Sequence, residues 1–130
     1  TMMDKSTGID LTAKIQGHCV GVSLRVRNKD YNSFTLNRHV NDEHSEIIKW
    51  TSKRNNFIKP AYHVQIAPIE NGVKVWRINI DAFSQFINRQ IKTSKLISFY
   101  NNRLKCYEFP FENVRGVAGV IVFELGNSFT

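Results

Sequence analysis

Two runs of residues near the start of the chain alternate between apolar and polar side chains, with a glycine-containing triplet between them. The first run is residues 9–15, the second is residues 19–27, and Gln16-Gly17-His18 separates them. Alternation with a period of two predicts a β-strand that has one buried face. The stretch from Thr7 to Arg27 therefore predicts a β-hairpin, and we expect the rest of the chain to be organised around it.

Two registers of this hairpin keep its apolar faces matched. A turn at Gly17-His18 places Asp10 opposite Arg25, whereas a turn at Gln16-Gly17 places Asp10 opposite Ser23. A shift by an odd number of residues would place valines opposite the aspartate, so such shifts are excluded. Either register gathers a carboxylate, a hydroxyl and a guanidinium on one face within about 5–8 Å. A plain cross-strand ion pair between Asp10 and Arg25 would explain the same pattern.

The next residues predict a third strand and a helix. Residues 34–40 alternate again, and three consecutive short strands predict an antiparallel meander. Asn41 or Asp42 is expected to cap a helix that ends near residues 54–56.

The second half of the chain predicts another hairpin, a helix and a last strand. Asn71-Gly72 is the strongest turn signal in the sequence, and it separates the expected strands 62–67 and 73–80. Asp81 is expected to cap a helix that reaches Lys92, followed by an irregular region that is rich in aromatic and basic residues. The valines and isoleucine of residues 117–125 predict a buried strand.

These elements predict one α/β (α+β) domain over residues 1–130. We expect a single mixed sheet that starts with the antiparallel meander and has helices packed on it. Residues 1–6 are expected to be flexible or a cloning remnant.

The charge balance favours an anionic partner. The formal net charge of +7 on 130 residues is typical of proteins that bind nucleic acid, and after that acidic membranes, although solubility alone would also account for it. The two cysteines and the lack of an apolar run of membrane length favour a cytoplasmic protein that has no membrane segment. The cysteines and four histidines lack the spacing of a zinc site.

The order of these features resembles the PD-(D/E)XK phosphodiesterase superfamily, which includes restriction enzymes, resolvases and phage exonucleases. Gly8-Ile9-Asp10-Leu11 resembles the strand with the metal-binding aspartate, and residues 22–27 stand where the acid-x-lysine strand belongs. Residues 34–38 followed by residues 45–49 resemble the next strand and helix of phage or mobile-element members. The resemblance implies a restriction-endonuclease-like fold that acts on DNA with Mg²⁺ or Mn²⁺. It also implies that Asp10 and the main-chain carbonyl of Leu24 are metal ligands, and that Arg25 lies at the scissile phosphate.

Two positions depart from the pattern of the family. Ser23 stands where the family usually has a carboxylate or glutamine, and Arg25 stands where it has lysine. An arginine stabilises phosphate charge but stays protonated, so it cannot act as a general base. The departures predict weakened or lost activity. The alternative is therefore a catalytically inactive module of the same fold that binds DNA or docks a protein within a larger assembly.

Other residues could complete or extend the site. Glu46 could supply the missing acid and Lys49 the missing amine, although an ordinary surface ion pair at this spacing explains both. Tyr100 to Tyr107 interleaves aromatic and basic residues, which is typical of strand-binding surfaces but equally of a core. Basic side chains on or near the hairpin and the first helix are candidates for contacts with the nucleic-acid backbone. They are Arg25, Arg27, Lys29, Arg38, Lys53 and Arg54.

Overall fold

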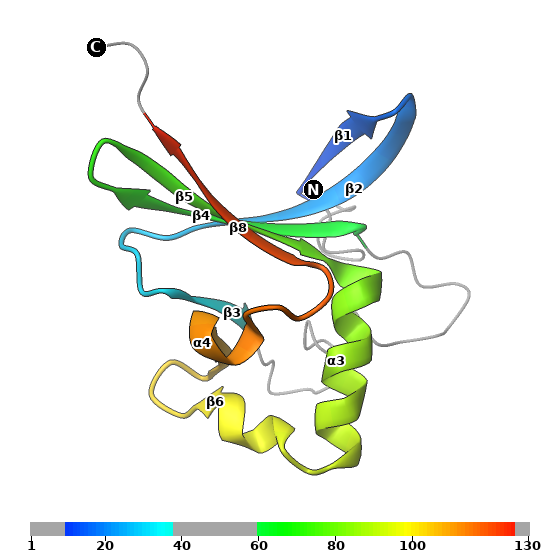
Figure 1. The fold of residues 1–130 in the computed structure, drawn as a ribbon, viewed down its shortest axis with the longest axis vertical. Helices are drawn as coiled ribbons and strands as arrows, with labels where there is room; N and C mark the ends of the chain where they lie inside the picture. The colour runs from blue at the N-terminus through cyan, green and yellow to red at the C-terminus, as the bar shows by residue number, and fades with distance from the viewer. Residues whose placement is uncertain (1–9, 38–59, 127–130) are drawn as a thin grey trace.

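The computed structural model describes residues 10–37 and 60–126, which form two β-sheets and a small number of helices (Figure 1). This confirms the α+β class. In chain order the elements are β1 (Leu11–Ile15), β2 (His18–Val26), β3 (Ser33–Asn37), β4 (Tyr62–Ile69), β5 (Gly72–Asn79), α3 (Ile80–Lys92), the 3-10 helix η2 (Leu96–Phe99), β6 (Tyr100–Asn101), β7 (Cys106–Pro110), α4 (Phe111–Val114) and β8 (Val120–Gly126).

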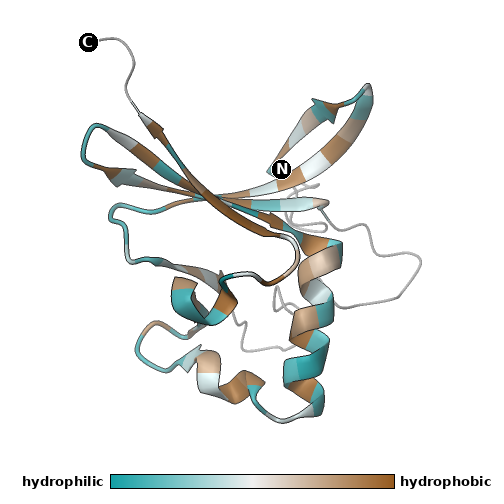
Figure 2. Ribbon diagram, in the orientation of Figure 1, coloured by the Kyte–Doolittle hydropathy of each residue, from teal (hydrophilic) through white to brown (hydrophobic). Residues whose placement is uncertain are grey.

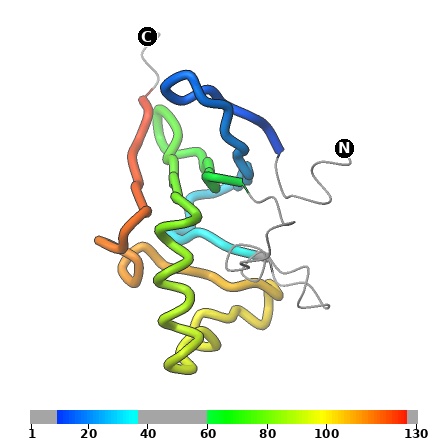
Figure 3. Tube along the Cα trace, turned by 90° about the vertical axis from the view of Figure 1, so that its right-hand side faces the viewer, coloured from blue at the N-terminus to red at the C-terminus, as the bar shows by residue number. Residues whose placement is uncertain are grey.

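The larger sheet, sheet A, has five strands in the order β1-β2-β4-β5-β8. β2 and β4 are parallel, and the other neighbours are antiparallel. The smaller sheet, sheet B, has three antiparallel strands in the order β3-β7-β6. Figure 3 shows β3 and β7 side by side, on the same side of sheet A as α3.

The predicted first hairpin is confirmed, and its turn is Gln16-Gly17. Leu11 pairs with Val22 and Ile15 with His18, so the same register places Asp10 opposite Ser23. Gln16 and Gly17 have φ of 52° and 81°, which is the backbone of a type I′ turn and matches the twist of the strands. The second hairpin is also confirmed, but its turn is centred one residue earlier than predicted, on Glu70 and Asn71.

The predicted single sheet with an antiparallel meander is wrong. β3 belongs to sheet B, where it pairs with β7, and the neighbour of β2 in sheet A is the parallel strand β4. The physical reason is burial. Phe34 and Leu36 of β3 are fully buried, and Phe34 stacks against Phe109 of β7 at 5.0 Å between ring centroids. Sheet B gives these side chains a core against α3, which a third strand in sheet A would not provide.

The helix α3 begins one residue before the predicted cap. Asn79 is the N-cap residue, and its side-chain oxygen accepts a hydrogen bond from the amide of Ala82 at 3.0 Å. Asp81 lies in the first turn instead, where its negative charge is attracted by the positive end of the helix dipole. The apolar face of α3 packs into the core through Phe83, Phe86 and Ile87.

The core lies between sheet A on one side and α3 with sheet B on the other. We call the face of sheet A that points into it the inner face. On β5 the inner face is apolar, with Trp76 and Ile78 fully buried. On β2 and β4 it is polar, with Ser23, His63 and Gln65 buried. This polar half is where the predicted cluster of the hairpin falls.

The opposite, outer face of sheet A is apolar and partly exposed. Figure 1 shows α3, α4 and β6 on the same side of the sheet, and Figure 2 shows hydrophobic residues along β8. Several large apolar side chains therefore meet solvent on this face. They are Leu11, Ile15, Val26, Ile121 and Leu125, which are 41–70% exposed.

Candidate functional site

Strand pairing brings the predicted hairpin residues together and adds two residues from β4. Ser23 lies beside His63, and Arg25 lies beside Gln65, in the parallel pair β2–β4. Asp10 directly precedes β1, and the register of the hairpin places it opposite Ser23. The sequence predicted the first three of these residues but neither His63 nor Gln65. Their alternation within residues 62–67 marked them as one polar strand face, whereas the neighbour of that strand could not be read from the pattern.

Asp10 is exposed, and its carboxylate is engaged with the main chain of β2. Its Oδ2 accepts a hydrogen bond from the amide of Leu24 at 2.6 Å. Leu24 thus contacts Asp10 through its N–H, whereas the family resemblance implies a role for its carbonyl oxygen. Within the described ranges, no three His, Cys, Asp or Glu side chains gather in a way that could hold a metal ion. The role of Asp10 as a ligand of Mg²⁺ or Mn²⁺ therefore stays a prediction, because the described residues supply one carboxylate to such a site.

Ser23 is paired with His63 inside the protein. The Oγ of Ser23 and the Nδ1 of His63 are 3.0 Å apart, and the tautomer of the ring decides which one donates. Ser23 is 7% exposed and His63 is fully buried. A buried hydroxyl needs a hydrogen-bond partner, and this pair supplies one. The contact accounts for a serine at this position without a metal ion.

Arg25 and Gln65 connect the inner face of sheet A to the edge of sheet B. Arg25 donates through Nη1 to the main-chain oxygen of Thr35, and also to the Thr35 hydroxyl at 3.0 Å. Gln65 donates through Nε2 to the main-chain oxygen of Ser33 at 2.8 Å. β3 is an edge strand of sheet B, so the main-chain oxygens on its open side have no neighbouring strand in that sheet to donate to them. Arg25 and Gln65 donate to two of these oxygens, which would otherwise be buried without a donor. Arg25 therefore has a structural role between the sheets.

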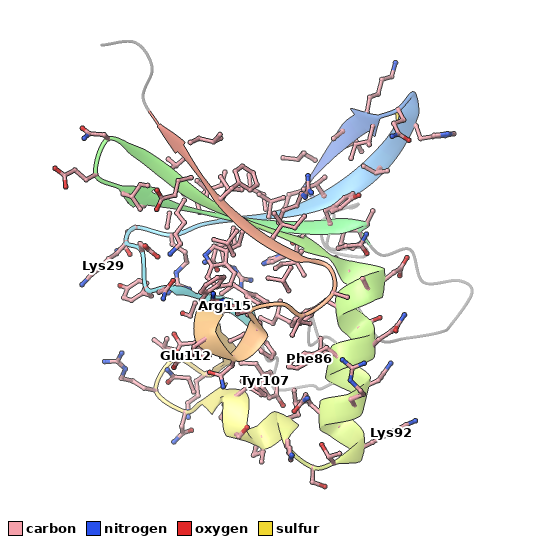
Figure 4. The ribbon with its side chains drawn as sticks, in the orientation of Figure 1. Lys29, Phe86, Lys92, Tyr107, Glu112 and Arg115 are labelled. Atoms are coloured by element: carbon pink, nitrogen blue, oxygen red, sulfur yellow. The ribbon has the colours of Figure 1, made fainter. Side chains whose placement is uncertain are left out.

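A second group of cations lies at the connection from β2 to β3, where Arg27 and Lys29 surround Tyr31. The guanidinium carbon of Arg27 is 4.8 Å from the centroid of the Tyr31 ring, and Lys29 Nζ is 5.7 Å from it. Tyr31 is 49% exposed. Lys29 points away from the body of the protein (Figure 4). We call Arg27, Lys29 and Tyr31 the basic–aromatic cluster.

The loop that carries this cluster is held in place by Lys74 of β5. Lys74 Nζ lies 3.3 Å from Asp30 Oδ2 and donates to Asn32 Oδ1 at 2.7 Å. Asp30 also accepts from the amide of Asn32 at 2.8 Å. The carboxylate of Asp30 is thereby paired with Lys74 of β5. These contacts join the loop that carries Arg27, Lys29 and Tyr31 to sheet A.

The remaining predicted site residues lie outside the described residues. They are Arg38, Glu46, Lys49, Lys53 and Arg54, together with the predicted helix that carries most of them. Their roles stay predictions. No family model, curated protein or solved structure matches this chain. Among the described elements, no helix combines the length and apolar character that crossing a membrane would require.

Proposed function

We propose that this chain is a DNA-binding domain that contacts the phosphate backbone through the basic–aromatic cluster. The observation that carries the proposal is the exposed Tyr31 ring with Arg27 and Lys29 against it, in a chain of net charge +7. Cations that follow a phosphate backbone next to an exposed aromatic ring are typical of surfaces that bind nucleic-acid strands.

The contacts within the hairpin cluster favour binding over cleavage. Ser23 is paired with His63, Arg25 donates to Thr35 and Asp10 accepts from the amide of Leu24, so each expected catalytic residue of the hairpin has a partner within the protein. The phosphate contact expected of Arg25 is better served by Arg27 and Lys29, which lie beyond the end of β2. Binding of this kind needs no metal ion, and its affinity falls as salt rises.

The second candidate is a restriction-endonuclease-like domain that cleaves phosphodiesters with Mg²⁺ or Mn²⁺. The observation that favours it is the exposed carboxylate of Asp10 opposite Ser23. Incubation of the protein with linear, branched and single-stranded DNA plus either ion tests it. Cleavage that disappears in Asp10→Ala would support this candidate, and cleavage that persists in Asp10→Ala would remove Asp10 from the mechanism.

Fluorescence anisotropy of labelled DNA over a series of salt concentrations tests the main proposal. Lys29→Ala should weaken binding and reduce the slope of log affinity against log salt by about 0.7–0.9, the value of one lost phosphate contact. Tyr31→Ala should weaken binding at every salt concentration, because it removes a stacking surface worth about 1–3 kcal/mol per base.

Lys92→Ala is the matched control, since Lys92 is an exposed lysine at the end of α3 (Figure 4). It removes the same charge and should change the slope little. Equal losses in Lys29→Ala and Lys92→Ala would mean that the cluster has no special role. A complete lack of binding at low salt would leave the protein-docking alternative.

A further inference from the structure

A cleft of about 580 Å³ opens on sheet B, bordered by η2, β6, β7 and α4. Phe99, Tyr100 and Pro110 give it flat apolar surface, and Asn101, Glu108 and Asn113 give it polar groups. This volume is within the usual range of small-molecule sites, and most of the lining is polar, since Ser98 and Asn102 also border the cleft.

Glu108 is the charged group of this cleft, and its carboxylate is held by two donors. Asn101 Nδ2 donates to Glu108 Oε1 at 3.2 Å, and Ser33 Oγ donates to Glu108 Oε2 at 3.0 Å. A carboxylate has about four lone-pair sites, so it can accept further hydrogen bonds from a ligand. The residues described as lining the cleft include no Lys or Arg, so it suits a ligand group that donates hydrogen bonds rather than a phosphate.

The cleft lies next to the basic–aromatic cluster. Ser33, which contacts Glu108, is two residues beyond Tyr31 and pairs with Pro110 of the cleft wall. The amide of Phe111 donates to the main-chain oxygen of Asn32 at 2.9 Å, so α4 is also joined to the loop of the cluster. The loop of the cluster and the wall of the cleft are therefore joined directly through Asn32 and Ser33.

We infer that the cleft binds an unpaired base that carries an exocyclic amino group, with Glu108 as the acceptor. A carboxylate that accepts from the N4 amino group of cytosine is an established form of base recognition, and thymine has no such group. The aromatic side chains Phe99 and Tyr100 supply the flat contact surface. The inference rests on the proposed DNA binding. It specifies the ligand as single-stranded DNA whose bases carry exocyclic amino groups.

Anisotropy with short oligo(dC) and oligo(dT) of equal length, at one salt concentration and neutral pH, tests the inference. The wild-type chain should bind oligo(dC) about 5–10-fold more tightly, the lower part of the discrimination that a good base contact provides. Glu108→Gln should bring the ratio of affinities to within about twofold of one, because its amide has to serve both internal donors with one oxygen. Asn113→Leu, at an exposed position on α4, should lower the ratio without altering the internal contacts of Glu108.

Glu112→Gln is the matched control for Glu108→Gln, because Glu112 is an exposed carboxylate on α4 that does not line the cleft. It makes the same change in charge and should leave the ratio unchanged. Equal affinity of the wild-type chain for oligo(dC) and oligo(dT), with a salt slope that still depends on Lys29, would overturn the inference and leave the proposed function standing. A lack of salt-sensitive binding to both oligonucleotides would overturn both.

Discussion

Replacement of Arg25 by methionine tests whether Arg25 stabilises the fold or binds phosphate. Methionine keeps an unbranched apolar side chain and removes the guanidinium that donates to Thr35. Thr35 is 5% exposed, so its main-chain oxygen would lose its donor in a place that water reaches poorly. An unsatisfied buried acceptor costs about 1–3 kcal/mol. Arg25 is half-buried, so we take about 2 kcal/mol as the expected loss in the free energy of unfolding.

For a chain of 130 residues, a loss of that size lowers the midpoint of thermal unfolding by about 7 °C. Urea and thermal unfolding measure it, and Lys29→Met is the matched control. Lys29 is exposed, so its replacement should change the free energy of unfolding by less than about 0.5 kcal/mol. Below its melting temperature, Arg25→Met should keep the wild-type salt slope for DNA, whereas Lys29→Met should not. Wild-type stability in Arg25→Met combined with a loss of DNA affinity would refute the structural role.

Three further predictions concern the packing that supports the site, and urea unfolding measures each of them. Asn79→Ala removes the N-cap hydrogen bond to the amide of Ala82 and should cost about 0.5–2 kcal/mol; an unchanged midpoint would mean that another group caps α3. Gly119→Ala should destabilise more than Gly116→Ala. Both have positive φ, but the added Cβ meets Ala82 Cβ and Asn79 O at 2.9 Å only at Gly119, and equal losses would contradict this crowding. Phe34→Ala should cost about 3–5 kcal/mol, because its ring is fully buried among Trp76, Phe83 and Phe109; a loss under about 1 kcal/mol would show that sheet B is not part of the core.

The sequence predicted the local elements well because their signals are local. Alternation identified β1, β2, β3 and β4, and the need to keep one apolar face narrowed the hairpin register to two choices. It could not choose between them, since Gly17 suits either central position of a two-residue turn. The left-handed backbone of Gln16, with φ of 52°, decides the register in the structure.

The assembly of the strands into sheets could not be predicted in the same way. The pattern of residues 34–36 indicates a strand, but its partner β7 lies about seventy residues further along the chain. The full burial of Phe34 and Leu36 against α3 and β7 decides which sheet the strand joins. Such pairing depends on contacts between distant segments, and a strand signal by itself contains no information about them.

The same limit applies to the predicted site, where the residues were correctly grouped but their partners were not visible. Ser23 and Arg25 share a face because of strand periodicity, yet the partner of Ser23 is forty residues away and that of Arg25 belongs to the other sheet. Arg25 of β2 and Arg27, which directly follows this strand, both donate to the hydroxyl of Thr35. Arg25 lies within the β2–β4 pair, whereas Arg27 lies at its end, where its guanidinium also meets the exposed Tyr31 ring. Under the proposed function, the phosphate contact would therefore lie beyond the end of β2, at the exposed Lys29 and the Tyr31 side of Arg27, rather than beside Asp10.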